Sequence, residues 1–201
     1  MNDESLRVII AGAQRGDRAA LAALVERYAG RLFGFFYHMT GRRDDAEEMM
    51  QEVFLRVVRM IGAYSDHGRF EPWLFRIAAN LTRDRIRRDR RSPMVCVTES
   101  DEPDGDPLPG AFTDESPADR SEQNEEIDRL NAALAQLPEA ERQVVMLRHF
   151  SQMSFKEIAE LMGTPLGTAL ARAHRGLARL RVLMEGHEGA SDHDAYAARA
   201  S

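Results

Sequence analysis

The sequence predicts an all-α protein made of two small helical domains that are joined by an acidic, flexible linker. Outside the middle of the chain, apolar residues recur at the three- and four-residue spacing of amphipathic helices. Residues 92–126 instead contain five prolines and eleven acidic residues, a composition typical of disorder. Near the C-terminus a short Gly-Thr-Pro turn separates two helical patterns, which is typical of a helix-turn-helix.

The net charge of −6 over 201 residues is unevenly distributed. Residues 1–91 carry 17 basic and 13 acidic side chains, residues 92–126 carry 1 and 11, and residues 127–201 carry 9 and 9. Because the acidity lies in the middle segment, the total does not exclude a nucleic-acid partner.

Several classes of protein are disfavoured by what the sequence lacks. Cys96 is the single cysteine, so no disulfide can form within the chain. No run approaches the ~18 apolar residues of a membrane-spanning helix, and the N-terminus does not read as a signal peptide, so we expect a cytoplasmic protein without membrane insertion. There is no P-loop, no nucleophile elbow and no Cys/His ligand set. We therefore expect neither an enzyme nor a bound cofactor or metal.

The first domain is predicted to begin with two helices within residues 5–38, separated by a break at Gly16, whose large apolar residues form a core. Asp44 is then placed to cap a helix over residues 45–61. One face of that helix carries Asp45, Glu48, Gln51 and Glu52. This face is either a solvated surface or a docking surface for a basic partner, and the residues alone leave both interpretations open.

Residues 62–69 read as a loop, and the helix that follows from Phe70 ends in a basic run. Arg83 to Arg91 holds six arginines against two aspartates, with Tyr64 and Trp73 upstream. Arginines with nearby aromatic side chains suit a partly single-stranded nucleic acid, because phosphates are neutralised while bases stack on the rings. For Trp73, burial in the core is the alternative interpretation.

The second domain is predicted to end in a pair of helices over Ser154–Arg181. Glu157 follows Ser154 by three residues, which is the spacing of a capping box. Gly163 suits the left-handed conformation that ends a helix. Thr164-Pro165 is then expected to cap and start the second helix.

The second helix of the pair has two contrasting faces. At ~100° per residue, the side predicted to face the core carries Leu166, Leu170, Ala173, Leu177 and Leu180. The other side carries Thr168, Arg172, Arg175 and Arg179. The second helix of a helix-turn-helix enters the major groove of DNA, so this face predicts DNA binding. A solvated arginine face on a helical hairpin is the alternative.

Three stretches resemble the extracytoplasmic-function (ECF) group of sigma factors, group IV of the sigma-70 family. DDAEEMMQEVFLRV at Asp44–Val57 is similar to the segment with which that family docks on core RNA polymerase. FEPWLFRIAANLTRDRIRR at Phe70–Arg88 is similar to the segment that melts the promoter and reads the −10 element. Residues Leu137–Arg181 are similar to the domain that reads the −35 element.

The resemblance implies an alternative sigma factor that directs promoter-specific transcription initiation, with a domain organisation and a set of partners. The implied segments are a region 2-like domain over 1–91, a flexible linker over 92–124, a region 4-like helix-turn-helix domain over 125–185 and a disordered tail over 186–201. The implied partners are core RNA polymerase, promoter DNA and an anti-sigma factor.

Carried over by position, the resemblance also implies three sets of binding residues. Contacts with core polymerase fall on Asp45, Glu48, Gln51 and Glu52. Contacts with the −10 element fall on Tyr64, His67, Arg69, Trp73, Asn80, Arg83, Arg87 and Arg88. Contacts with the −35 element fall on Thr168, Arg172, Arg175 and Arg179.

The chain departs from the family pattern inside the second helix. Where the family commonly reads GTVKSRLHRA, this chain reads GTALARAHRG, so that Leu170 and Ala171 replace a lysine and a serine and Ala173 replaces a leucine. We expect Leu170 to fill the volume vacated at Ala173, and the lost lysine to weaken −35 binding. Two alternatives stay open, a stand-alone helix-turn-helix regulator and a sigma mimic that titrates an anti-sigma factor.

Overall fold

The computed structural model describes residues 3–65, 67–91 and 117–197, and these form helices without any strand. The all-α prediction is therefore confirmed for the described residues. The chain divides into two compact units, unit 1 with residues 1–36 and 43–114, and unit 2 with residues 37–42 and 115–201. The predicted domain limits remain predictions, as does the linker, most of which lies outside the described residues.

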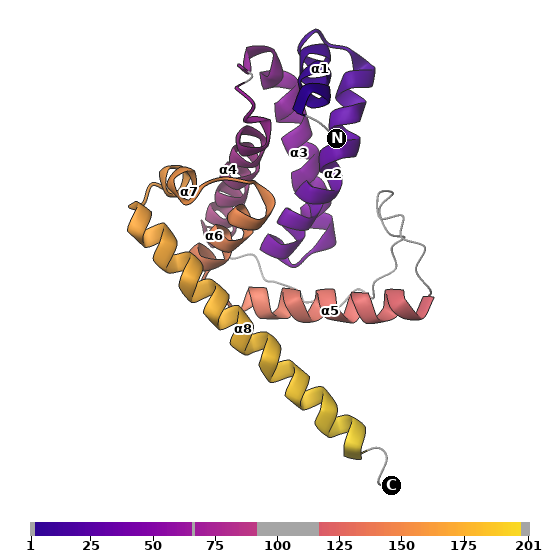
Figure 1. Cartoon of the computed structure of the whole chain (residues 1–201), viewed down its shortest axis with the longest axis vertical. Coiled ribbons are helices and arrows are strands. Elements are labelled where there is room, and N and C mark those ends of the chain that lie inside the picture. Colours follow the sequence, from indigo (N-terminus) through magenta and orange to yellow (C-terminus); the bar gives the residue numbers. More distant parts are fainter. Residues whose placement is uncertain (1–2, 66, 92–116, 198–201) are drawn as a thin grey trace. The chain divides into compact units, whose positions relative to one another are not determined.

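Unit 1 is built from four helices and one short turn of 3₁₀-helix (Figure 1). In chain order they are α1 (Asp3–Gln14), α2 (Arg18–Thr40), α3 (Arg43–Met60), η1 (Ile61–Ala63) and α4 (Phe70–Arg91). The predicted break between the first two helices is confirmed, because Gly16 adopts a positive φ of 79°. The Asp17 carboxylate accepts a hydrogen bond from the Ala19 N–H at 2.9 Å, which caps the start of α2.

Aromatic rings hold α2 against α4 in the core of unit 1. Phe35 and Phe75 are fully buried, and their rings meet edge to face with centroids 5.6 Å apart. Tyr28 is buried too, with its ring 5.5 Å from that of Phe70. Burial, followed by the nearby Glu71 carboxylate, raises the pKa of the Tyr28 hydroxyl. These contacts fix one side of α4 in the core and leave the other side for solvent or a ligand.

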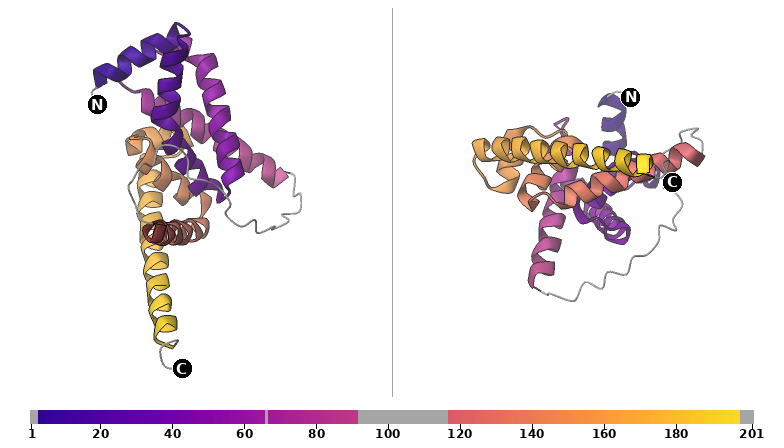
Figure 2. Two further views of the ribbon diagram at one scale, coloured as in Figure 1. Left: turned by 90° about the vertical axis from the view of Figure 1, so that its right-hand side faces the viewer. Right: turned by 90° about the horizontal axis from the view of Figure 1, so that it is seen from below.

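Unit 2 consists of α5 (Pro117–Ala135), α6 (Glu139–Phe150), α7 (Phe155–Met162) and α8 (Leu166–Ala197). Figure 2 shows α8 as one straight rod whose C-terminal half extends beyond α6 and α7.

Two of these helices reach into segments that the sequence predicts to be irregular. The helix α5 begins at Pro117, inside the predicted linker, because proline is tolerated in a first turn and residues 118–135 contain no further proline or glycine. The helix α8 continues to Ala197 through the predicted tail, since extending an existing helix needs no new nucleus.

Small residues form the buried side of α8, and Gly176 forms its seam with α6. Ala169 is fully buried and Ala173 is 5% exposed. A Cβ atom added at Gly176 would lie 3.0 Å from Val145 Cγ2 and 3.4 Å from Glu141 Cβ. Side chains of α6 can pack directly on the α8 backbone at Gly176 because no side chain stands between them.

The prediction that the leucines of α8 face the core is wrong for Leu166 and Leu170, whereas Leu177 and Leu180 line an apolar hollow of unit 2. Leu166, Leu170 and Leu177 are 46%, 44% and 55% exposed. The small residues on the buried side of α8 set the rotation of this helix about its own axis. These leucines therefore lie beside the buried face and not on it. Leu170 therefore does not fill the volume at Ala173, because Leu170 is exposed and is not among the residues that line the hollow beside Ala173.

Enlarging the seam glycine is expected to destabilise unit 2. The variant Gly176→Leu should lose about 1–3 kcal/mol of unfolding free energy, because its side chain has to displace Val145. Gly167 on the same helix has nothing within 4 Å of an added Cβ, so Gly167→Leu should be neutral or gain up to about 1 kcal/mol. Urea unfolding followed by circular dichroism measures both, and equal losses would contradict the seam.

Candidate nucleic-acid interfaces

The helix pair α7–α8 has the local geometry of a helix-turn-helix. Ser154 Oγ accepts from the Glu157 N–H at 3.3 Å, and the Ser154 N–H donates to Glu157 Oε2 at 2.9 Å. The predicted capping box is therefore confirmed. Gly163 has a φ of 63°, as predicted, and its left-handed conformation ends α7 after two turns.

The predicted cap of α8 is wrong by one residue. The helix begins at Leu166, and the Pro165 carbonyl accepts hydrogen bonds from the N–H groups of Thr168 and Ala169 at 2.9 and 3.2 Å. The Thr164 hydroxyl is buried and has no hydrogen-bond partner among the described residues. The turn is instead closed by the Thr164 N–H, which donates to the Ala159 carbonyl at 2.9 Å.

A carboxylate of α6 holds two of the arginines of α8. Glu141 Oε1 accepts from Arg175 Nε at 3.0 Å, and Glu141 Oε2 accepts from Arg179 Nη1 at 2.9 Å. The Glu141 side chain is only 8% exposed, whereas the two arginine side chains are 53% and 51% exposed. Glu141 thus fixes the orientation of both arginines from their buried side, while their exposed surfaces can still contact an anion.

Arg172 and Thr168 complete the predicted −35 set. Both are half-buried, and no hydrogen bond or ion pair of the Arg172 guanidinium occurs among the described residues. In the described parts of the chain, Arg172 therefore has no carboxylate partner, unlike Arg175 and Arg179. His174, which is not among the predicted residues, is exposed on the same helix.

The exposed side of α4 forms a polar row that starts at an aromatic ring. Residues at spacings of three and four along this side share one face of the helix, and they are Trp73, Arg76, Asn80, Arg83 and Arg87. Arg76 was not among the predicted residues, although its spacing of four from Asn80 was a usable signal. Arg88 lies off this face, and its Nε donates to the Asp84 carbonyl at 3.4 Å.

The loop before α4 is attached to an aromatic cluster and to α1. The Tyr64 ring lies 4.8 Å from that of Trp73 and 5.5 Å from that of Phe70. Gln14 Nε2 donates to the carbonyls of Tyr64 at 2.6 Å and Ile61 at 3.2 Å. His67 and Arg69 are exposed. Trp73 is half-buried, so it contributes to the cluster and still presents part of its ring to solvent.

The acidic face of α3 is partly neutralised inside unit 1. Arg85 of α4 binds Asp45 Oδ1 at 2.7 Å and Glu48 Oε2 at 3.2 Å. Asp45 is 18% exposed, whereas Glu48 is 70% exposed. Glu52 accepts from Arg56 Nε at 2.8 Å. The structure thus brings the predicted acidic residues onto one face, with Asp45 the most enclosed.

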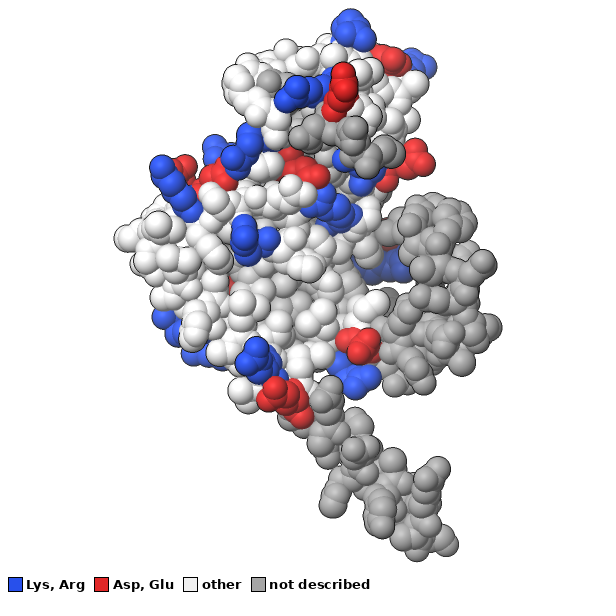
Figure 3. All heavy atoms as spheres, in the orientation of Figure 1, with Lys and Arg blue, Asp and Glu red and all other residues white. Residues whose placement is uncertain are grey.

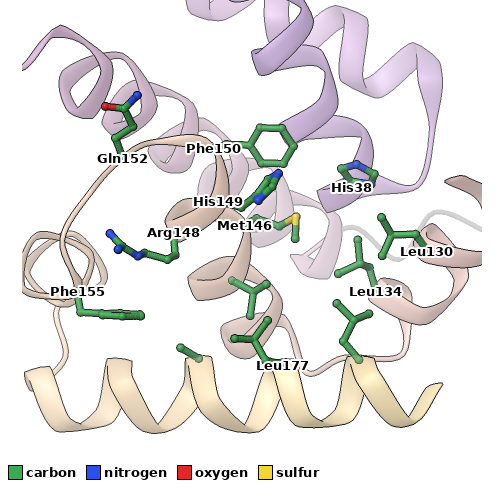
Figure 4. A pocket seen from close by; sticks show the side chains of 13 residues that line it. His38, Leu130, Leu134, Met146, Arg148, His149, Phe150, Gln152, Phe155 and Leu177 are labelled. Carbon is green, nitrogen blue, oxygen red and sulfur yellow. The ribbon is translucent and has the colours of Figure 1, made fainter. Parts of the chain in front are cut away.

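On the face drawn in Figure 3, basic and acidic side chains are interspersed and neither sign forms a continuous patch. Figure 4 shows an apolar hollow in unit 2, with Leu134 of α5, Phe155 of α7 and Leu177 of α8 in its walls. Leu177, although 55% exposed, therefore belongs to the lining of this hollow.

Within the described residues, no helix combines the length and apolar character that crossing a membrane requires.

Comparison with known proteins relates both units to transcription factors. The model of Sigma-70 region 2 matches residues 24–92, and that of Sigma-70 region 4 matches residues 127–180. The chain is 36% identical over 177 residues to the ECF RNA polymerase sigma factor SigE of Mycolicibacterium smegmatis, covering 86% of this chain and 65% of that protein. It is 31% identical over 170 residues to SigW of Bacillus subtilis, covering 84% and 90%.

A solved structure has the same fold. The sigma factor RpoE from Bartonella quintana, in complex with the anti-sigma factor NepR, matches with a TM-score of 0.61 and 20% sequence identity. The match covers 82% of this chain and 96% of that chain.

Proposed function

Because the chain belongs to the ECF family of RNA polymerase sigma factors, we propose that it binds core RNA polymerase and directs transcription from promoters with its own −10 and −35 elements. The observation that carries the proposal is that two different candidate DNA-binding surfaces lie in separate units of the chain. A cationic, partly aromatic row on α4 lies in one unit, and a helix-turn-helix with outward arginines lies in the other. The chain itself performs no bond chemistry and acts in the cytoplasm.

The −10 element is assigned to unit 1. An extruded base fits the loop beside Tyr64 and Trp73, since stacking on an aromatic ring is worth about 1–3 kcal/mol per base and offsets an unstacking cost of a few kcal/mol. His67 and Arg69 flank that position. The polar row of α4 then meets the duplex edge and backbone with Asn80, Arg83 and Arg87, and Arg88 adds a further cation at the helix end.

The −35 element is assigned to α8. Arg172, which no carboxylate of the described residues binds, is placed to contact a phosphate or a base edge, with Thr168 one turn earlier. Arg175 and Arg179 contact the backbone with their exposed surfaces while Glu141 holds them. Hydrogen bonds that fix a guanidinium in advance lower the conformational entropy that binding removes.

Core polymerase is assigned to the acidic face of α3. Glu48, Gln51 and Glu52 present their side chains at the surface, and Asp45 supports them through Arg85. A basic helix of the partner fits this face by charge complementarity, which speeds association and selects the partner. The likeness to a sigma factor solved with its anti-sigma factor supports an anti-sigma factor as a further partner.

Run-off transcription with purified core polymerase tests the function. Promoter-specific transcripts that depend on this protein are the expected result. Binding to a promoter duplex without polymerase and without transcripts would favour a stand-alone helix-turn-helix regulator. Neither transcripts nor duplex binding, together with tight binding to an anti-sigma factor, would favour a titrating mimic.

Removing the charge of Arg172 is expected to weaken −35 recognition selectively. Arg172→Ala should cost about 1–3 kcal/mol of promoter binding by the holoenzyme, while association with core polymerase stays unchanged. Arg18→Ala, which removes an equal charge from the exposed side of α2, is the matched control and should leave both intact. Filter binding at fixed salt measures promoter affinity, and equal loss of both activities in Arg172→Ala would mean that the residue is structural.

Reversing the charge on α3 is expected to impair docking. Glu52→Lys should weaken association with core polymerase about tenfold or more, because a like charge then faces the basic partner. Glu26→Lys makes the same change at an exposed position of α2 and should have no effect. Fluorescence anisotropy of labelled protein titrated with core polymerase measures the affinities, and wild-type affinity for Glu52→Lys would remove the docking assignment.

A further inference from the structure

The N-terminal turns of α8 expose an apolar pair that the fold does not use. Leu166 and Leu170 are one turn apart on the same side of the helix, and they are 46% and 44% exposed. Leu177 lines the hollow of unit 2, but neither Leu166 nor Leu170 is among the residues that line it. The buried side of α8 carries Ala169 and Ala173 instead.

The position of this pair points to DNA as the surface that covers it. The N-terminal part of the second helix of a helix-turn-helix is the part that meets base edges. From Leu166 to Leu183 the helix carries four arginines and no acidic side chain, so an anionic partner is favoured over a second apolar protein surface. Exposed His174 continues the same side of the helix one turn after Leu170.

The major groove offers a single apolar feature among its base edges, which is the C5-methyl group of thymine. We propose that Leu170, assisted by Leu166, reads thymine methyl groups in the −35 element. The proposal rests on the function proposed above and names a determinant of its specificity. The proposal also explains why leucine can replace the lysine that the family commonly has at this position. A lysine contacts a phosphate or a base edge as a cation, whereas a leucine makes an apolar contact.

The test uses DNA that lacks only the methyl group. A promoter is first obtained by run-off selection from a template library whose −35 region is randomised. Each thymine of the selected −35 element is then replaced singly by deoxyuridine, which keeps every hydrogen-bonding group of the base. With wild-type holoenzyme, one position or two neighbouring positions should lose about fourfold in promoter binding, the value of one buried methyl group.

A double-mutant cycle identifies the side chain responsible. Leu170→Ala should bind the thymine promoter about fourfold more weakly and show no further loss with deoxyuridine at the sensitive position. Val182→Ala, at another exposed apolar position of α8, is the matched control and should retain the full deoxyuridine effect.

The outcomes separate this inference from the proposed function. Promoter-specific transcription with no deoxyuridine effect at any −35 position would overturn the inference and leave the function standing. An undiminished deoxyuridine effect in Leu170→Ala would overturn it too, because another group would then contact the methyl. Absence of promoter-specific transcripts from the whole library would count against the proposed function itself.

Discussion

Close packing between α6 and α8 decides which residues the second unit can present to another molecule. Gly176 admits the α6 side chains to within van der Waals distance of its backbone, so the angular position of α8 is fixed. That position puts the arginines on one flank and two leucines on the other. It also brings Glu141, on the facing helix, within reach of Arg175 and Arg179. Structure and binding surface therefore depend on the same backbone contact.

Local signals made much of unit 2 predictable from the sequence. The capping box at Ser154 and the left-handed Gly163 depend on residues a few positions apart, and both are present as expected. The rotation of α8 was not predictable in this way. Leucine is more hydrophobic than alanine, so a periodicity argument points the leucines inward, but packing density favours whichever residues let the backbones approach. Glycine and alanine at a spacing of three and four were the missed signal.

Long-range ion pairs were the other part that the sequence did not disclose. Arg85 lies within a run that reads as one basic cluster, yet it points from α4 to Asp45 and Glu48, about forty residues earlier. Nothing local distinguishes it from Arg83 or Arg87, because its direction depends on how α4 packs beside α3. In both units, then, counting arginines overstates the charge available to a ligand, since some of them are partnered by the protein's own carboxylates.

The amide of Gln14 ties down both ends of the short turn η1, through the carbonyls of Ile61 and Tyr64. The chain leading to the loop is therefore already ordered in the free protein. Fixing the backbone of one residue costs about 1–2 kcal/mol of conformational free energy. For the chain before the loop, folding has already supplied this free energy when the protein meets a promoter. On the proposed function, α1 thus contributes to the binding of melted DNA indirectly, because Gln14 orders the chain that leads to the loop before DNA is bound.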